Sequence, residues 1–308
     1  MPALAYLGPE GTFTHQAALD VARSGDVLEP AGTAIDVVRA VASGAAEGGV
    51  VAFENSLEGS VAENLDEILR SPGALLAGER VLPVSFALLR TPGDEAPLRA
   101  VTSHPFALAQ CSGFLRGEGL EGIEAPSTAA ACRDLGAPGL GALAPVTAAE
   151  VYGLRVEREA LEDEAAPSTR FIVLRGRCPA PTGRDRSFFA VTPRRDEPGS
   201  LVRLLQEFSV RGINLTTIES RPTRALLGEY RFLIECEGHV ADAHVRAAVL
   251  GLLRFPGETR FLGSFPEDPA RQAHPPGGEL PPEAVRGYEQ MLERVASEAV
   301  TSAQREAG

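Results

Sequence analysis

The sequence predicts an α/β protein built from two successive parts. Residues 3–152 repeat an apolar segment, a polar loop and an amphipathic segment, a pattern typical of a mainly parallel sheet covered by helices. Residues 187–263 follow the different order strand, helix, strand, strand, helix, strand, which is the βαββαβ order of the ferredoxin-like split motif. A length of 308 residues with 44% hydrophobic residues agrees with about two domains that have cores of their own.

The elements of the first part follow from apolar periodicity and capping residues. Thr33 and Asp36 open one predicted helix, and Ser60 and Glu63 are expected to form the capping box of another. Ser103 and Ser127 with Thr128 are expected to cap two more helices. The predicted strands are 3–7, 49–53, 81–90, 99–102, 122–125 and 140–143, and the predicted helices are 15–23, 34–41, 61–69, 105–115, 129–134 and 148–152.

The second part follows a segment rich in Pro, Gly and Arg at 178–186, which is interpreted as a linker. Residues 266–282 are rich in Pro and Gly and are expected to be mobile. Residues 283–299 have helical composition and either pack on the protein or another subunit or form a frayed tail. The predicted strands of this part are 187–192, 213–218, 230–236 and 259–263, and its predicted helices are 201–211 and 243–253.

Composition excludes several functions. The formal charge of −13 argues against nucleic acid, whose binding needs basic patches. All 29 basic residues are Arg, and the absence of Lys excludes Schiff-base chemistry and the lysine of a phosphate-binding loop. The cysteines and histidines form no disulfide or metal-ligand pattern, so no cofactor or metal is expected and each histidine is interpreted as a surface or structural residue. No segment resembles a membrane span or a signal peptide, which predicts a cytoplasmic protein.

Polar loops follow the predicted strands of the first part. They lie at 8–14, 54–60, 103–105 and 126–128. Because the carboxyl ends of parallel strands share one edge of a sheet, these loops are expected to line a common cleft. Helix N-termini that meet there favour a small ligand with more than one negative charge. The alternative for loop 54–60 is an ordinary connection between a strand and a helix.

Residues 168–174 combine Ser168, Thr169 and Arg170 with a short apolar run. The pattern predicts a buried strand with polar residues at its entrance. These polar residues are either incidental or lie at the mouth of the cleft.

Six motifs occur in order along the chain. They are Gly8-Pro9-Glu10-Gly11-Thr12-Phe13, Glu54-Asn55-Ser56 with Gly59 and Val61, Ser103-His104-Pro105 with Gln110-Cys111, Thr169-Arg170-Phe171, Gly212-Ile213-Asn214-Leu215 and Glu219-Ser220-Arg221-Pro222. Together they resemble the motifs of the prephenate dehydratase family with a C-terminal ACT regulatory domain. Two positions depart from the family pattern, because Phe106 replaces the usual Gln and Pro167 replaces the usual Asn.

The resemblance implies a catalytic domain at 1–177 with a periplasmic-binding-protein-like fold and a cleft between two lobes. Lobe one would comprise about 1–80 and 168–177, and lobe two about 81–167. The linker at 178–186 would then lead to an ACT domain at 187–265, followed by the segment 266–308.

The resemblance also implies a carbon–oxygen lyase that needs no cofactor. It would convert prephenate to phenylpyruvate, carbon dioxide and water in L-phenylalanine biosynthesis. Thr169 would hydrogen-bond the leaving hydroxide or relay a proton to it, and Glu54 would be a proton source. Arg170 would hold a carboxylate or be a structural ion-pair partner, and Phe13 and Phe171 would be an apolar wall or core residues. The implied substrate-binding residues are Thr12, Phe13, Asn55, Ser56, Gly59, Ser103, Gln110, Thr128, Arg170 and Phe171.

Regulation by L-phenylalanine is implied for the second domain, at an interface within a homodimer or homotetramer. The alternative is an ACT domain that only joins subunits. The implied phenylalanine-binding residues are Pro198, Gly199, Ser200, Leu201, Gly212, Ile213, Asn214, Leu215, Glu219, Ser220, Arg221 and Pro222. Two other functions remain open at this stage: an arogenate dehydratase with the same chemistry, and a non-catalytic sensor of amino acids.

Overall fold

The fold is taken from a computed structural model of the chain. It describes residues 2–56, 59–163, 167–194, 197–223 and 229–271, together with the single positions Arg286 and Gln290. Residues 1–271 form one compact unit, and 272–308 form a second. Apart from Arg286 and Gln290, the helix expected at 283–299 lies outside the described residues, as does most of the segment expected to be mobile at 266–282.

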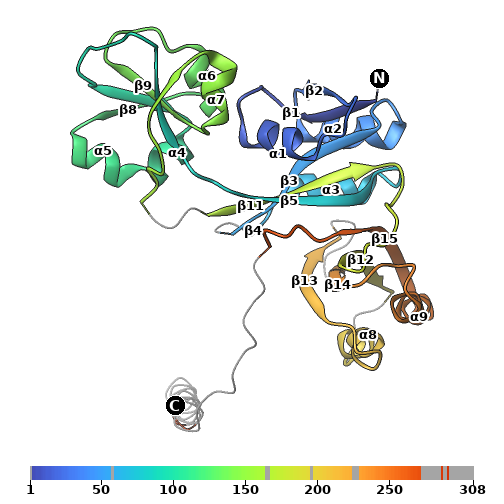
Figure 1. The fold of residues 1–308 in the computed structure, drawn as a ribbon. Coiled ribbons are helices and arrows are strands. Elements are labelled where there is room, and N and C mark those ends of the chain that lie inside the picture. The colour runs from blue at the N-terminus through green and yellow to red at the C-terminus, as the bar shows by residue number, and fades with distance from the viewer. Residues whose placement is uncertain are drawn as a thin grey trace. The chain divides into compact units, whose positions relative to one another are not determined.

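The larger sheet continues from the first part of the sequence into the second (Figure 1). Its strand order is β13-β14-β12-β15-β5-β11-β3-β1-β2, with β4 paired to β3. Its strands from the first part are β1 (Ala3–Leu7), β2 (Val27–Ala31), β3 (Gly48–Asn55), β4 (Gly59–Ser60), β5 (Leu75–Pro83) and β11 (Ser168–Arg175). The helices among them are α1 (Phe13–Val21), α2 (Ala34–Ser43) and α3 (Ala62–Arg70).

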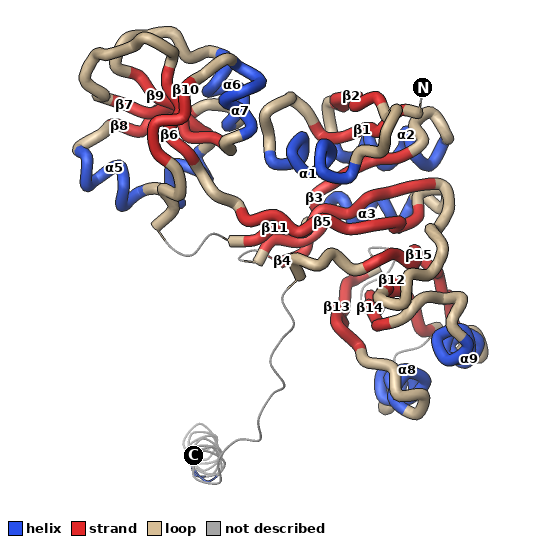
Figure 2. The backbone as a smooth tube through the Cα atoms, in the orientation of Figure 1, coloured by secondary structure: helices blue, strands red, loops and turns tan. Residues whose placement is uncertain are grey.

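The smaller sheet has the order β10-β6-β9-β7-β8, and Figure 2 shows its strands grouped with α5, α6 and α7. Its strands are β6 (Ala87–Arg90), β7 (Ala100–Ser103), β8 (Glu121–Glu124), β9 (Leu140–Ala144) and β10 (Arg155–Arg158). The helices of this group are α4 (Pro105–Gln110), α5 (Ser112–Glu118), α6 (Thr128–Arg133) and α7 (Thr147–Tyr152).

The second part of the sequence forms what we call the C-terminal subdomain, residues 185–266. Its elements are β12 (Asp185–Pro193), α8 (Ser200–Ser209), β13 (Leu215–Pro222), β14 (Tyr230–Glu237), α9 (Ala243–Leu252) and β15 (Gly257–Pro266). These strands lie in the order β13-β14-β12-β15, and every pair among them is antiparallel. This is the arrangement of the ferredoxin-like split motif, as the order of elements in the sequence predicts.

The expectation of mainly parallel sheets is wrong, because both sheets are mixed. β1 is parallel to β2 and β3, but β11 returns between β3 and β5 and is antiparallel to both. In the smaller sheet β6 is likewise antiparallel to β9 and β10. Neither β11 nor β6 is followed by a helix before the next strand, so the strand–loop–helix pattern does not indicate their direction.

The single strand expected at 81–90 is also wrong, because it is divided between the two sheets. β5 ends at Pro83 and β6 begins at Ala87. At the division the backbone leaves the sheet ladder: Val84 N donates to Pro167 O at 2.6 Å and Phe86 N donates to Glu162 Oε2 at 3.1 Å. A continuous apolar run cannot reveal such a crossing, because its residues are buried on both sides of the division.

Two predicted caps are wrong. α3 begins after Val61 without a side-chain cap, and Ser60 Oγ instead donates to Glu219 Oε2 of β13 at 2.7 Å. α4 is capped by His104, whose Nδ1 accepts from Phe106 N at 3.2 Å. Ser103 is the last residue of β7. The caps by Thr33 and Ser127 are confirmed.

Backbone contact joins the two parts of the larger sheet at Gly263. There β15 runs parallel to β5, with Gly263 opposite Leu76. A Cβ at Gly263 would lie 2.1 Å from Leu76 O, and the φ of +150° is one that side chains with a Cβ rarely adopt. One apolar core spans this junction, because Phe188, Leu233 and Phe265 are buried in the same cluster as Val51 and Leu65.

Candidate functional site

A cleft lies where three helices begin and the ends of β3 and β11 meet. Its volume is about 430 Å³. The N-cap residues Thr12 of α1, His104 of α4 and Ser127 of α6 all line it. Helix N-termini present free N–H groups and partial positive charge, so the cleft favours an anionic ligand. The lining residues are Leu7, Gly8, Thr12, Phe13, Asn55, Val84, Phe86, His104, Phe106, Ala107, Pro126, Ser127, Thr128 and Thr169.

Thr169 and Asn55 form a hydrogen-bonded pair in this cleft. They lie opposite each other across the antiparallel strands β11 and β3, and Asn55 Nδ2 donates to Thr169 Oγ1 at 3.0 Å. A hydroxyl accepts through its lone pairs and donates its single proton separately. The Thr169 hydroxyl is therefore oriented by Asn55 with its own proton available to a ligand.

A bulge in β3 sets this pairing. Arg170 pairs with Glu54 but Phe171 pairs with Ala52, so Phe53 is the extra residue. Bulges bend a strand and re-aim its side chains, and they are frequent beside functional sites. The shift places Asn55 opposite Thr169 at the strand end.

The loop before α1 is held from both sides. Gly11 N donates to His15 Nδ1 at 3.0 Å, and the His15 ring stacks on Tyr6 with centroids 5.0 Å apart. Burial lowers the pKa of His15 below its ordinary value of 6.5, against an opposing effect of Glu10. Tyr152 Oη donates to Glu10 O at 2.8 Å from α7. Gly11 has a φ of +80°, and a Cβ there would lie 2.7 Å from the Tyr152 ring.

His104 and Ser127 are cleft residues that sequence reasoning missed as ligand contacts. His104 accepts from Phe106 N through Nδ1, so the neutral ring carries its proton on Nε2. Ser127 Oγ accepts from Ala130 N at 2.9 Å. Their signal in the sequence was position, since they lie in the loops 103–105 and 126–128 that follow predicted strands. Phe106, which departs from the family pattern, also lines the cleft.

The structure does not bring every predicted site residue to the cleft. Ser103 is fully buried and its hydroxyl donates to Leu143 O at 2.6 Å. Phe171 packs in a core cluster with Leu4 and Tyr6. Ser56 accepts from Ser168 N at 3.0 Å. The predicted residues outside the cleft lining are Glu54, Ser56, Gly59, Ser103, Gln110, Arg170 and Phe171, whereas Thr12, Phe13, Asn55, Thr128 and Thr169 lie within it.

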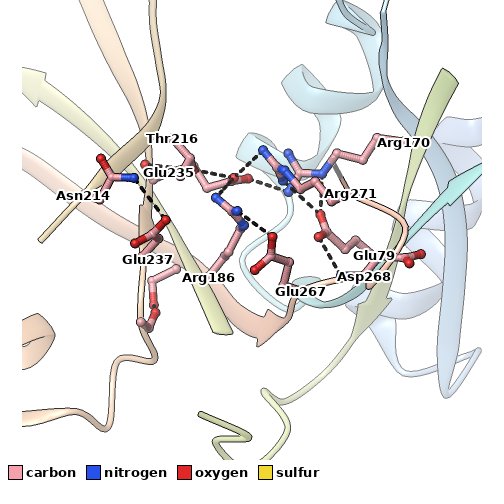
Figure 3. Close-up of polar contacts among 12 residues, drawn as sticks. Glu79, Arg170, Arg186, Asn214, Thr216, Glu235, Glu237, Glu267, Asp268 and Arg271 are labelled. Carbon is pink, nitrogen blue, oxygen red and sulfur yellow. Dashed lines mark hydrogen bonds and ion pairs between the residues drawn. The ribbon is translucent and has the colours of Figure 1, made fainter. Parts of the chain in front are cut away.

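Arg170 instead belongs to a buried group of charges on the other side of β11 (Figure 3). Its Nε is 2.6 Å from Glu79 Oε2, its Nη2 is 2.5 Å from Glu235 Oε2, and its Nη1 is 3.6 Å from Glu54 Oε2. Burial opposes the charged form of Arg170, but the carboxylates of Glu235 and Glu79 raise its pKa above the ordinary value. Of the two alternatives for Arg170, the geometry favours the structural ion-pair partner.

The predicted phenylalanine-binding segments do not line one cavity. A cavity of about 360 Å³ near the start of α8 includes Ser200 but no described residue of 212–215 or 219–222. Ile213 packs in the subdomain core. Glu219 and Arg221 face the α3 region, where Arg221 Nη2 is 3.6 Å from Asp66 Oδ1.

Within the described ranges, no cluster of His, Cys, Asp or Glu has the arrangement of a metal site. The helices of the described chain are all too short or too polar to cross a membrane.

The fold and the cleft together define a mixed α/β protein whose cleft, at strand ends and helix N-termini, suits a small anionic ligand. Residues 4–178 match the family described as prephenate dehydratase. The prephenate dehydratase of Mycolicibacterium smegmatis is 39% identical in an alignment that covers 90% of this chain and 94% of that protein. The chain therefore belongs to the prephenate dehydratase family, whose enzymes are lyases.

Two solved structures resemble the chain over most of its length. Prephenate dehydratase from Arthrobacter aurescens in complex with L-Phe is 31% identical with a TM-score of 0.76, covering 96% of this chain and 99% of that one. A structure described as GqqA, a novel type of quorum quenching acylase, is 29% identical with a TM-score of 0.78, covering 88% and 100% respectively.

Proposed function

We propose that the cleft converts prephenate to phenylpyruvate, carbon dioxide and water, and that the Thr169 hydroxyl assists the departure of the ring hydroxyl group. The observation that carries the proposal is the hydrogen bond from Asn55 to Thr169 within the cleft. It leaves the threonine proton free to donate, which is what a leaving hydroxide requires. Membership of the prephenate dehydratase family supports the same reaction.

The reaction needs no external electron carrier. The bond between the ring and its carboxylate breaks, and its electron pair enters the ring. The carbon–oxygen bond of the ring hydroxyl breaks at the same time, and the departing hydroxide gains a proton from solvent, relayed through Thr169, to become water. The ring becomes aromatic, which supplies the driving force. The protein therefore has to orient prephenate and stabilise the leaving oxygen, and Thr169 and the Nε2–H of His104 are the donors we assign to that oxygen.

Neutral donors hold the carboxylates in this proposal. None of the described residues that line the cleft is an Arg. The carboxylate of the pyruvyl side chain, which phenylpyruvate keeps, lies against the hydroxyls of Thr12, Ser127 or Thr128 and the helix N-termini beside them. The ring carboxylate that leaves lies against Phe13 and Phe106, because an apolar wall favours neutral carbon dioxide over a carboxylate.

The C-terminal subdomain is proposed to be an ACT regulatory domain that binds L-phenylalanine between subunits of a dimer or tetramer. The βαββαβ topology supports this assignment, as does the similarity to a relative whose structure is a complex with L-Phe. The separation of segments 212–215 and 219–222 from the cavity at α8 is compatible with a site completed by a second copy of the chain. Phenylalanine would shift the equilibrium between open and closed clefts.

The test is turnover of prephenate by purified full-length protein, measured as phenylpyruvate formation with and without phenylalanine. We expect turnover, and we expect phenylalanine to suppress it. Turnover that phenylalanine does not change would support the enzymatic assignment and overturn the regulatory one. Activity with arogenate but not with prephenate would make arogenate the substrate. Binding of amino acids without turnover of either compound would favour a non-catalytic sensor.

A further inference from the structure

The C-terminal subdomain contacts the strand that carries Thr169. Glu235 of β14 is fully buried, and its Oε2 lies 2.5 Å from Nη2 of Arg170, which directly follows Thr169 in β11. Arg170 is itself only 5% exposed. A buried guanidinium depends on such partners, because losing one leaves charge without compensation in a medium of low dielectric constant.

The same subdomain also contacts the strand pair that carries Asn55. Ser60 of β4 donates to Glu219 Oε2 of β13 at 2.7 Å. In the hairpin of β3 and β4, Ser60 pairs with Glu54 and Gly59 pairs with Asn55. Each contact is therefore made next to a member of the Asn55–Thr169 pair: Arg170 adjoins Thr169, and Ser60 pairs with Glu54, which adjoins Asn55.

Glu235 is fixed by its own subdomain as well as by Arg170 (Figure 3). Its Oε1 accepts from Thr216 Oγ1 at 2.7 Å and lies 3.1 Å from Arg271 Nη2. Arg271 Nη1 in turn lies 3.3 Å from Glu79, the second partner of Arg170. Arg186 Nη1 of β12 lies 3.5 Å from the same Oε1, so neighbours on several elements fix the carboxylate that pairs with Arg170.

We propose that Glu235 and, more weakly, Ser60 through Glu219 are positioning contacts by which the C-terminal subdomain holds the Asn55–Thr169 pair in its reactive geometry. The inference rests on the proposed function. Thr169 and Arg170 share one backbone segment, so a displaced Arg170 turns or shifts Thr169 relative to Asn55. A displacement of about 1 Å at a reacting group can cost about 10²-fold in rate.

The first test is Glu235→Gln in the full chain, with Glu207→Gln as the control. Glu207 is a carboxylate of α8 in the same subdomain, and its Oε2 lies 2.8 Å from Nη1 of Arg211, which follows the helix. We expect Glu235→Gln to lower kcat by about 10- to 100-fold with little change in KM, because substrate contacts remain while Thr169 is misplaced. The control is expected to keep wild-type kcat and KM.

Two milder variants cover the case in which Glu235→Gln does not fold. Thr216→Val removes the hydroxyl that orients Glu235 while leaving its charge in place. Ser60→Ala removes the second contact. Each is expected to lower kcat by about 2- to 10-fold without raising KM, as expected for loss of one hydrogen bond. Wild-type kcat in a folded Glu235→Gln, or in both milder variants, would overturn the proposal.

Hydrogen exchange separates this inference from the proposed reaction. We expect the amides of 168–171 to exchange faster in Glu235→Gln than in the wild type, while those of β1 and β2 are unchanged. If the wild type does not turn over prephenate, the proposed function fails but this measurement still tests the link. Unchanged exchange at 168–171 would then contradict it.

Discussion

The two sides of β3 and β11 differ sharply in charge. On one side Asn55 and Thr169 line a cleft whose described residues include no Arg, Asp or Glu. On the other side Glu54 and Arg170 join buried carboxylates and guanidinium groups. Neighbouring residues of a strand point to opposite faces. Adjacent residues of one short motif therefore have separate tasks: Thr169 faces the ligand, whereas Arg170 anchors the strand.

The difference suits the proposed chemistry. A permanent cation beside the leaving carboxylate would stabilise the charged ground state and oppose its conversion to neutral carbon dioxide. Hydroxyl groups and helix N-termini can hold the carboxylate that remains, without a guanidinium near the one that leaves. The arginine of the motif contributes its charge on the opposite side of the strand, where Glu79 and Glu235 balance it.

The largest effect is expected for Thr169→Ala, which removes chemistry from the cleft side and leaves the ion pairs intact. We expect kcat to fall by about 10²- to 10⁴-fold, the usual contribution of a positioned proton donor. Thr169→Ser keeps the hydroxyl and should retain much more activity. Thermal unfolding should show both variants folded. Turnover preserved in a folded Thr169→Ala would remove the residue from the mechanism.

Substitution of Asn55 tests the direction of the hydrogen bond between Asn55 and Thr169. Asn55→Ala removes the donor, and we expect kcat to fall by about 3- to 10-fold. Asn55→Asp places an acceptor opposite Thr169, so the threonine proton turns to the carboxylate instead of the substrate. We expect a loss of about 10²-fold or more for Asn55→Asp, comparable to removal of a donor from a reacting oxygen. Equal activity of the two variants would contradict the orientation we assign.

The sequence was sufficient to place the cleft but not to orient every residue in it. Loops after strands are local features, so loops 8–14 and 126–128 could be predicted to meet at the cleft, whereas Thr12, Thr128 and Thr169 were singled out by the family resemblance. Arg170 was left between two roles because its decisive partners are distant in sequence: Glu79 is 91 residues away and Glu235 is 65 away. Strand alternation already separates Arg170 from Thr169, but it does not show which side faces the ligand.

Long-range contact also explains the other corrections. Ser60 matches a capping box by spacing, but its hydroxyl finds Glu219, which is 159 residues away. Segment 266–271 was expected to be mobile from its composition. In the structure Asp268 is buried and accepts from Val81 N at 2.8 Å, and Arg271 pairs with Glu79 and Glu235. Composition cannot report such partners, because each bond joins residues that only the fold brings together.

An intermediate effect, on stability, is expected where the backbones of β15 and β5 meet at Gly263. Gly263→Ala would place a Cβ 2.1 Å from Leu76 O at a φ of +150°. We expect a loss of about 1 to 3 kcal/mol in the free energy of unfolding, measured with denaturant. Gly25→Ala is the control, because Gly25 also has a positive φ of +92° but nothing lies within 4 Å of its Cβ position. A loss no larger than that of the control would show that β5 and β15 separate without cost.

The smallest effect is expected for the pH dependence of stability that His15, beside the cleft, contributes. The pKa of His15 is lowered by burial, so the folded state favours the neutral ring that accepts from Gly11 N. Above the ordinary value of 6.5 the ring is neutral in both states, and its contribution to stability is complete. As the pH falls below 6.5, the unfolded chain takes up the proton first and the folded state is disfavoured. His15→Asn keeps an acceptor but does not titrate. Between pH 8 and 5 the wild type should lose stability faster than this variant, by at most about 1.4 kcal/mol per pH unit for one proton. Identical slopes would show that His15 stays neutral in both states, or is charged in both, over that range.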